Sequence, residues 1–192
     1  MKHRIAVLSF ALAAAGSLPG CLPLLVTGAA TGASMVHDQR SAGAVIDDQG
    51  IEIKAATSLR TDAQLREEAH LSVTSYNGIV LVTGEAPTAD LRERATDIVR
   101  NIDKVRTVHN ELIIAAPSSL MARSSDTLLT GKVKARLLGT RGFDSTRVKV
   151  VSSGGVVYLM GLVTRDEDEI ATEMTRTTDG VQRVVKIFEY VN

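Results

Sequence analysis

The stretch GIVLVTG at residues 78–84 decides the fold, because it recurs 77 positions later as GVVYLMG at residues 155–161. Both are short apolar runs bounded by glycines, the pattern of a strand buried in a sheet. Asn77-Gly78 opens the first run and Gly154-Gly155 the second, and both pairs favour the tight turn of a β-hairpin because their residues tolerate a positive φ. The chain therefore predicts two copies of one unit of about 70 residues.

The same elements are predicted around each run in the same order. A helix and an alternating strand (71–73 in the first copy) precede the run, and a second helix and a last strand follow it. The core positions of the first helix recur every four residues and are Ile51, Ala55 and Leu59 in one copy and Leu129, Val133 and Leu137 in the other. Those of the second helix are Leu91, Ala95, Ile98 and Ile102, matched by Ile170, Ala171 and Met174. The last strands are predicted over 108–114 and 184–191.

Each unit is thus predicted as α-β-β-α-β, a three-stranded mixed sheet covered by two helices on one face, which makes the fold class α+β. The tandem units are expected at residues 46–115 and 125–192, with a short polar linker at 116–124. A unit this small has a marginal core. Packing of the two copies against each other would enlarge the buried surface, although no sequence pattern defines how they pack.

The start of the chain has the layout of an export signal. Residues 2–4 (KHR) are basic, and the apolar run at 5–15 is too short to span a bilayer, which needs about 20 residues. The single cysteine, Cys21, ends the motif LPGC at residues 18–21, which resembles the bacterial lipobox. We therefore expect a lipoprotein signal peptide at 1–20 and lipid attachment to Cys21. The alternative is an ordinary cleaved signal followed by a free thiol.

Lipid on Cys21 would hold the chain at a membrane, because two or three acyl chains anchor a protein durably where one does not. The next residue is Leu22 rather than the aspartate that resembles an inner-membrane retention signal in enteric bacteria. The expected location is therefore the outer membrane, on its periplasmic side. Residues 21–45 would carry the lipidated cysteine and a flexible tether, since they are rich in Gly, Ala, Ser and Thr.

The composition excludes several classes of function. The chain has 22 Lys and Arg against 22 Asp and Glu, so its net charge predicts no binding to nucleic acid. The histidines show no metal-like spacing, and we expect no metal or cofactor. The acidic run at 166–169 leaves calcium as an alternative, but we interpret it, like Asp47-Asp48, as the start of a helix, where negative charge suits the helix dipole. No phosphate loop or catalytic triad stands out, so no enzyme activity is predicted.

The repeated glycine frame resembles that of a known family. Each copy ends the frame G-x-V-x-V/L-x-G with a strand-end glycine, Gly84 or Gly161, and continues with a helix and a strand, as in the BON domain. We assign structural roles to these glycines and to the turn glycines Gly78 and Gly155. Two such domains behind a lipobox resemble the dual-BON outer-membrane lipoproteins of Gram-negative bacteria. The resemblance implies phospholipid binding, maintenance of envelope integrity and no catalytic activity.

In that family, the first helix of the second domain engages anionic phospholipid, and the protein concentrates at division sites. The charge of the two copies agrees with such a division of labour. Residues 131–149 contain six basic residues and one acidic residue, a net charge of +5. The aligned window 53–71 contains three of each, a net charge of zero.

The first helix of the second copy also carries a second apolar stripe, opposite its core stripe. The stripe consists of Leu128, Gly131, Ala135 and Leu138, and its counterparts in the first copy (Gly50, Ile53, Thr57 and Arg60) are less apolar. Leucines beside lysines are typical of a helix that lies at a membrane surface. The residues predicted to bind phospholipid are Asp126, Leu128, Gly131, Lys132, Lys134, Ala135, Leu138, Arg141 and Phe143. The alternative is that Leu128 and Leu138 pack against the first domain and the lysines form a solvated face.

The sequence therefore predicts a non-enzymatic lipoprotein that binds an anionic phospholipid surface through its second domain and preserves the outer-membrane barrier. The first domain would be a structural module or would bind envelope proteins. The alternative is a periplasmic adaptor whose basic helix contacts a protein of the cell-wall or outer-membrane assembly machinery.

Overall fold

The computed structural model describes residues 40–192, which fold as two similar units. The first unit comprises α2 (Ala42–Thr61), α3 (Ala63–Glu68), β1 (His70–Tyr76), β2 (Ile79–Ala86), α4 (Ala89–Arg100) and β3 (Thr107–Ile114). The second comprises α5 (Leu120–Leu138), η1 (Ser145–Arg147), β4 (Val148–Ser153), β5 (Val156–Val163), α6 (Arg165–Arg176) and β6 (Arg183–Tyr190). The predicted signal peptide, Cys21 and most of the predicted tether lie outside the described residues.

Each unit contains the predicted mixed three-stranded sheet. In the first sheet β2 pairs antiparallel with β1 and parallel with β3, and in the second sheet β5 does the same with β4 and β6. The hairpin turns follow from their residues, because Asn77, Gly78, Gly154 and Gly155 all have a positive φ. A Cβ on Gly84 would overlap the carbonyl oxygen of His70, so only glycine lets the two strands approach at this point.

The first helix of each unit begins earlier than the sequence predicts. The hydroxyl of Ser41 accepts the N–H of Ala44 at 3.1 Å and caps α2, and Ser119 does the same for α5 through the N–H of Ala122 at 3.2 Å. The segment predicted as tether therefore ends in a helix, and the predicted linker 116–124 contains the first turn of α5. The prediction that Asp47-Asp48 starts the first helix is therefore wrong, because Ser41 supplies the cap of α2.

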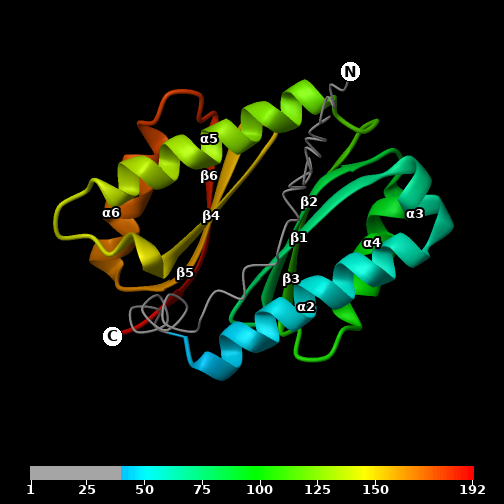
Figure 1. Ribbon diagram of the computed structural model, residues 1–192, viewed down its shortest axis with the longest axis horizontal. Helices are drawn as coiled ribbons and strands as arrows, with labels where there is room; N and C mark the ends of the chain where they lie inside the picture. Colours follow the sequence, from blue (N-terminus) through cyan, green and yellow to red (C-terminus); the bar gives the residue numbers. More distant parts are fainter. Residues whose placement is uncertain (1–39) are drawn as a thin grey trace, which may run out of the picture.

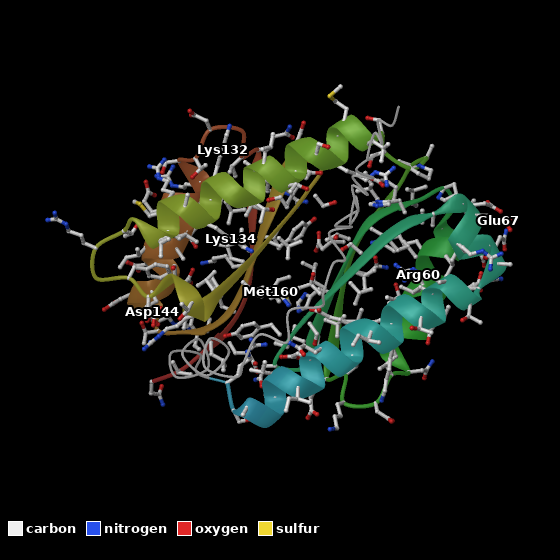
Figure 2. All side chains as sticks on the ribbon, in the orientation of Figure 1. Arg60, Glu67, Lys132, Lys134, Asp144 and Met160 are labelled. Atoms are coloured by element: carbon white, nitrogen blue, oxygen red, sulfur yellow. The ribbon has the colours of Figure 1, made fainter. Side chains whose placement is uncertain are left out.

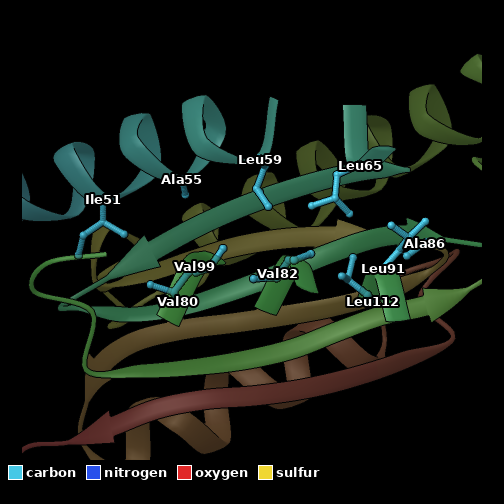
Figure 3. Close-up of a cluster of buried hydrophobic side chains, with 11 residues drawn as sticks. Ile51, Ala55, Leu59, Leu65, Val80, Val82, Ala86, Leu91, Val99 and Leu112 are labelled. Atoms are coloured by element: carbon cyan, nitrogen blue, oxygen red, sulfur yellow. The ribbon is translucent and has the colours of Figure 1, made fainter. Parts of the chain in front are cut away.

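Each unit has an aliphatic core between its helices and one face of its sheet, as predicted. In the first unit, Ile51, Ala55 and Leu59 point from α2 onto the sheet (Figure 3) and are at most 6% exposed. In the second unit, the predicted core positions of α5 are equally buried. The helices therefore lie on one face of each sheet, and the other face needs a different cover.

That cover is the sheet of the other unit. Tyr76 and Leu81 from the first sheet form a buried cluster with Tyr158, Met160 and Ile187 from the second, which we call the inter-sheet cluster. The molecule is consequently a stack of four layers, with α2 and α4 on one outer side, α5 and α6 on the other, and the two sheets between them (Figure 1). Strands β2 and β5 are buried on both faces, which explains their almost unbroken apolar runs.

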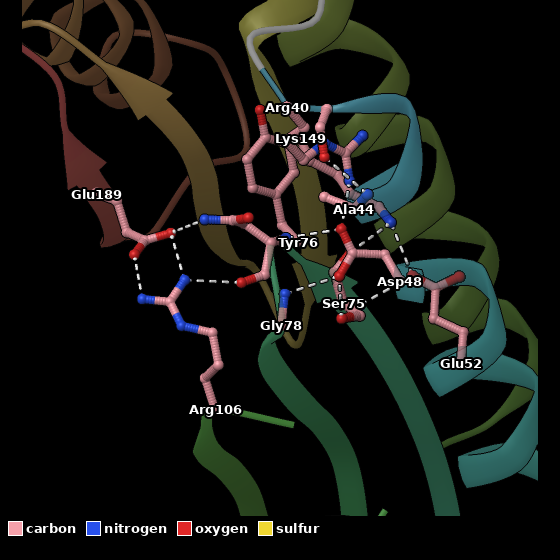
Figure 4. Close-up of polar contacts among 12 residues, drawn as sticks. Arg40, Ala44, Asp48, Glu52, Ser75, Tyr76, Gly78, Arg106, Lys149 and Glu189 are labelled. Atoms are coloured by element: carbon pink, nitrogen blue, oxygen red, sulfur yellow. Dashed lines mark hydrogen bonds and ion pairs between the residues drawn. The ribbon is translucent and has the colours of Figure 1, made fainter. Parts of the chain in front are cut away.

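Polar contacts surround the inter-sheet cluster at its rim. Lys149 of β4 lies 2.7 Å from the carboxylate of Glu52 on α2 and donates to the carbonyl oxygen of Ser75 at 3.1 Å. At another point Arg106 and Asn77 of the first unit both contact the carboxylate of Glu189 on β6 (Figure 4), at 2.8 and 2.6 Å. These contacts are partly exposed and contribute mainly to the orientation of the units, because ion pairs near water add little stability.

Tyr158 offers a direct test of the packing between the sheets. Its hydroxyl faces Glu111 of the first unit at 3.5 Å, and burial, followed by the charge of that carboxylate, raises the pKa of Tyr158 to about 12. Between pH 10 and about 12 the unfolded chain loses this proton while the folded chain keeps it, so the free energy of unfolding should fall over this range.

We expect phenolate absorbance to show a tyrosine that titrates near pH 12 in the folded protein and is missing from Tyr158→Phe. Titration of Tyr158 at its ordinary value of 10, with both domains still folded, would contradict the closed contact between the sheets.

Candidate lipid-binding site

Helix α5 lies in an outer layer of the molecule, and its apolar outward residues are uncovered. Leu128 is 68% exposed and Leu138 is 75% exposed. The alternative in which both leucines pack against the first domain is therefore wrong. Gly131 and Ala135, the other members of the predicted stripe, are exposed as well.

The exposed apolar residues extend further along α5 than the sequence predicted. Leu120 is 76% exposed and Met121 is 79% exposed, and both lie in the first turn of the helix. They are absent from the predicted stripe because the sequence places this turn in the linker. The helix has 19 residues and is about 28 Å long, so apolar side chains are exposed near both of its ends and at its centre.

Several basic side chains of the second unit are engaged in ion pairs or hydrogen bonds within the protein. Arg147 lies 2.7 Å from the carboxylate of Glu167, and Lys149 is paired with Glu52. The guanidinium of Arg136 donates to the carbonyl oxygen of Thr177 at 2.7 Å. The net charge of +5 counted from the sequence therefore overstates the charge that a ligand would meet.

Three basic residues, Lys132, Lys134 and Arg141, are exposed and, unlike Arg136, form neither an ion pair nor a side-chain hydrogen bond within residues 40–192. The two lysines project to opposite sides of α5 (Figure 2). Lys132 lies beside the 154–155 hairpin turn, whereas Lys134 faces the groove toward the first domain. The lysines thus flank the apolar stripe on both sides, and together with Arg141 they leave about three positive charges for an anionic surface.

Two residues predicted to contact lipid have other roles. Phe143 is only 8% exposed and packs in the core of the second unit, so the prediction that its ring inserts into lipid is wrong. It follows Gly142, whose positive φ turns the chain back toward the sheet.

Asp126 binds the backbone of the neighbouring hairpin turn. Its carboxylate accepts the N–H groups of Gly154 and Gly155 at 2.9 and 3.1 Å, which ties α5 to the turn of the β4–β5 hairpin. Asp48 makes the same contact in the first unit, accepting the N–H groups of Asn77 and Gly78 (Figure 4) at 2.7 and 2.8 Å. Asp48 is therefore a buried anchor inside α2, and its interpretation as a helix-start residue is wrong.

The matched aspartates predict unequal losses of stability. Asp48 is 3% exposed and also binds the Ser75 hydroxyl and Arg40, so Asp48→Ala leaves several buried donors unpaired and should cost about 3 kcal/mol or more. Asp126 is less buried, and Asp126→Ala should cost about 1–2 kcal/mol.

Urea unfolding measures both losses, and hydrogen exchange should show faster opening of the turn amides in each variant. Equal and negligible costs would contradict the anchoring role of both carboxylates.

The acidic run at 166–169 lies at the start of α6, as predicted, and serves the fold. Thr164 and Glu167 form the predicted capping box, and Asp168 binds Lys186 at 3.0 Å and Tyr190 at 2.7 Å. Burial alone would raise the pKa of Asp168, but the hydrogen bonds from Tyr190, Lys186 and Thr172 outweigh it and lower the pKa. Within residues 40–192 no cluster of His, Cys, Asp and Glu has the arrangement of a metal site. In the same range no helix is both long and apolar enough to cross a membrane.

Comparison with known proteins agrees with this architecture. Residues 47–116 and residues 125–192 each match the BON domain, and the chain belongs to the BON-domain family. It is 34% identical over 185 residues to the outer membrane lipoprotein DolP of Haemophilus influenzae, with 96% of both chains covered. Together these findings support a BON protein of the DolP family and an outer-membrane lipoprotein.

Two further relatives have other descriptions. The chain is 36% identical over 154 residues to a 21 kDa hemolysin of Actinobacillus pleuropneumoniae, covering 80% of this chain and 79% of that one. It is 26% identical over 186 residues to the osmotically-inducible protein Y of Escherichia coli, covering 95% and 92%.

Proposed function

We propose that this chain is a non-enzymatic lipoprotein, held by lipid on Cys21 at the periplasmic side of the outer membrane, whose second domain binds anionic phospholipid through α5. In this role it maintains outer-membrane integrity, with enrichment at division sites. The observation that carries the proposal is the exposure of Leu128 and Leu138, at 68% and 75%, beside lysines that no carboxylate within residues 40–192 pairs.

The magnitudes fit reversible contact with a membrane. Burial of one leucine side chain contributes about 1.5–3 kcal/mol, and each basic residue near an anionic surface contributes about 1 kcal/mol. Two leucines and three basic residues therefore supply several kcal/mol, from which the cost of ordering the protein at the surface is subtracted. The lipid on Cys21 would keep the protein at the membrane, and α5 would set how the domains face it.

The four-layer stack implies that only one of the first helices can lie on a given membrane surface. Because α2 and α5 belong to opposite outer layers (Figure 1), α2 faces away from a surface that α5 contacts. Helix α2 exposes Ile46 at 64% and Ile53 at 67%. These residues favour a second role, in which the first domain binds an envelope protein while the second holds the membrane.

Vesicle co-sedimentation of residues 22–192 tests lipid binding, since this chain keeps every contact described above. We expect binding to phosphatidylglycerol vesicles and none to phosphatidylcholine vesicles. Leu138→Glu should weaken binding at least about tenfold, because it removes an apolar contact and adds a negative charge.

Ile53→Glu is the matched control, since it makes the same kind of change at an equally exposed site on the opposite layer. It should alter binding less than about twofold, the effect of one distant and screened charge. Absence of binding to anionic vesicles at low ionic strength would contradict the proposed function, as would equal losses in both variants.

A further inference from the structure

A cleft of about 370 Å³ lies between the two domains, at the C-terminal end of α5. The first domain lines it with Arg40 and Tyr76. The second domain lines it with Lys134, Leu137, Leu138, Ser145, Thr146, Val148, Lys149 and Val150. Its volume is within the range of pockets that hold small ligands.

The charged residues that line this cleft are all positive: Arg40, Lys134 and Lys149. The nearby carboxylates do not line it. Asp48 binds Arg40 at 2.7 Å and Glu52 binds Lys149 at 2.7 Å, but neither carboxylate belongs to the residues that line the cleft. The side chain of Lys134 has no such partner among residues 40–192 and gives the wall a net positive charge.

The rest of the wall combines hydroxyl groups with apolar side chains. Ser145 and Thr146 contribute hydroxyl groups, and Val148 and Val150 of β4 contribute apolar side chains. Leu138 belongs both to the cleft and to the exposed apolar stripe of α5, so the cleft is continuous with the surface that we propose to contact lipid. A ligand with an anionic head and an apolar tail fits this lining. Its head would lie among the basic residues, and its tail would leave the cleft past Leu138.

We propose that this cleft holds the phosphate headgroup of a single anionic glycerophospholipid molecule, with Lys134 as its principal cationic contact and Arg40 and Lys149 as further ones. The proposal rests on the proposed function and extends it, because it makes the first domain part of the lipid site. A phosphatidylcholine headgroup would bring its own positive charge against these three residues and is disfavoured.

The two lysines of α5 provide the test. Short-chain phosphatidylglycerol, kept monomeric, is titrated into residues 22–192 and followed by amide chemical shifts. Shifts are expected at Ser145, Thr146 and the other cleft residues. Lys134→Gln should weaken binding of the monomeric lipid about fivefold, the effect of one basic residue. Lys132 does not line the cleft, so Lys132→Gln should leave binding of the monomeric lipid within twofold, although it should weaken binding to anionic vesicles.

A second variant, in the first domain, changes the partner of Lys149. Glu52→Gln releases the ammonium group of Lys149 from its carboxylate, while the amide oxygen can still accept the N–H of Ser75 that Glu52 binds at 2.8 Å. It should tighten binding of the monomeric lipid by up to about fivefold. If both lysine variants lose the same affinity for the monomeric lipid, or if Glu52→Gln has no effect, the proposal that the cleft holds the headgroup is wrong. The lipid would then contact only the surface of α5.

Three further probes identify the ligand and separate this proposal from the proposed function. Short-chain phosphatidylcholine should give no shifts in the cleft, and inorganic phosphate should bind more weakly than the lipid. Phosphate binding as tight as the lipid would overturn the lipid assignment in favour of free phosphate. If the protein binds anionic vesicles but the monomeric lipid shifts no cleft amides, the cleft proposal is wrong and the proposed function stands. If the protein neither binds vesicles nor shows cleft shifts, both proposals are wrong.

Discussion

The structure depends on apolar packing between the two sheets. Helices cover one face of each sheet, and the other face carries residues such as Leu81 and Met160, which are at most 1% exposed. Burial of one such side chain contributes about 1.5–3 kcal/mol, and five central residues of this kind are a large part of the stability of domains this small. Each domain is therefore an obligatory cover for the other, and the pair should unfold as one unit.

This packing also determines what each first helix can do. Because the sheets meet face to face, α2 and α5 are placed in opposite outer layers, although both descend from the same element of the repeat. The duplicated helices thus face different surroundings, and their sequences have diverged accordingly. The same packing brings Arg40 and Lys149 together beside Lys134 and so creates the interdomain cleft, which neither domain has alone.

Much of the fold could be predicted because its signals are local. Asn77-Gly78 forms the turn by its own backbone preference, and the four-residue spacing of Leu129, Val133 and Leu137 marks a buried helix face wherever the helix packs. The inter-sheet cluster also has a signal in the sequence. The nearly unbroken apolar runs of β2 and β5 indicate strands buried on both faces, which one layer of helices cannot provide.

The site was harder to predict because its residues act over long distances in sequence. The role of Asp126 depends on backbone N–H groups 28 and 29 positions away, and nothing near it in the chain distinguishes it from a helix-start residue. Lys132 and Lys134 are two positions apart, yet only the fold shows that one faces the first domain. Phe143 is predicted to contact lipid because it follows the basic helix closely in the chain, but the turn at Gly142 returns it to the core.

Face-to-face packing of the two sheets should direct α5, and not α2, toward the membrane. Residues 22–192 contain no cysteine, so Leu138→Cys and Ile53→Cys each introduce a unique site for an environment-sensitive fluorophore. On phosphatidylglycerol vesicles, the label at position 138 should shift its emission to the blue, and the label at position 53 should keep the emission it has in water. Equal blue shifts at both positions would contradict the proposed contact of α5, and not α2, with the membrane.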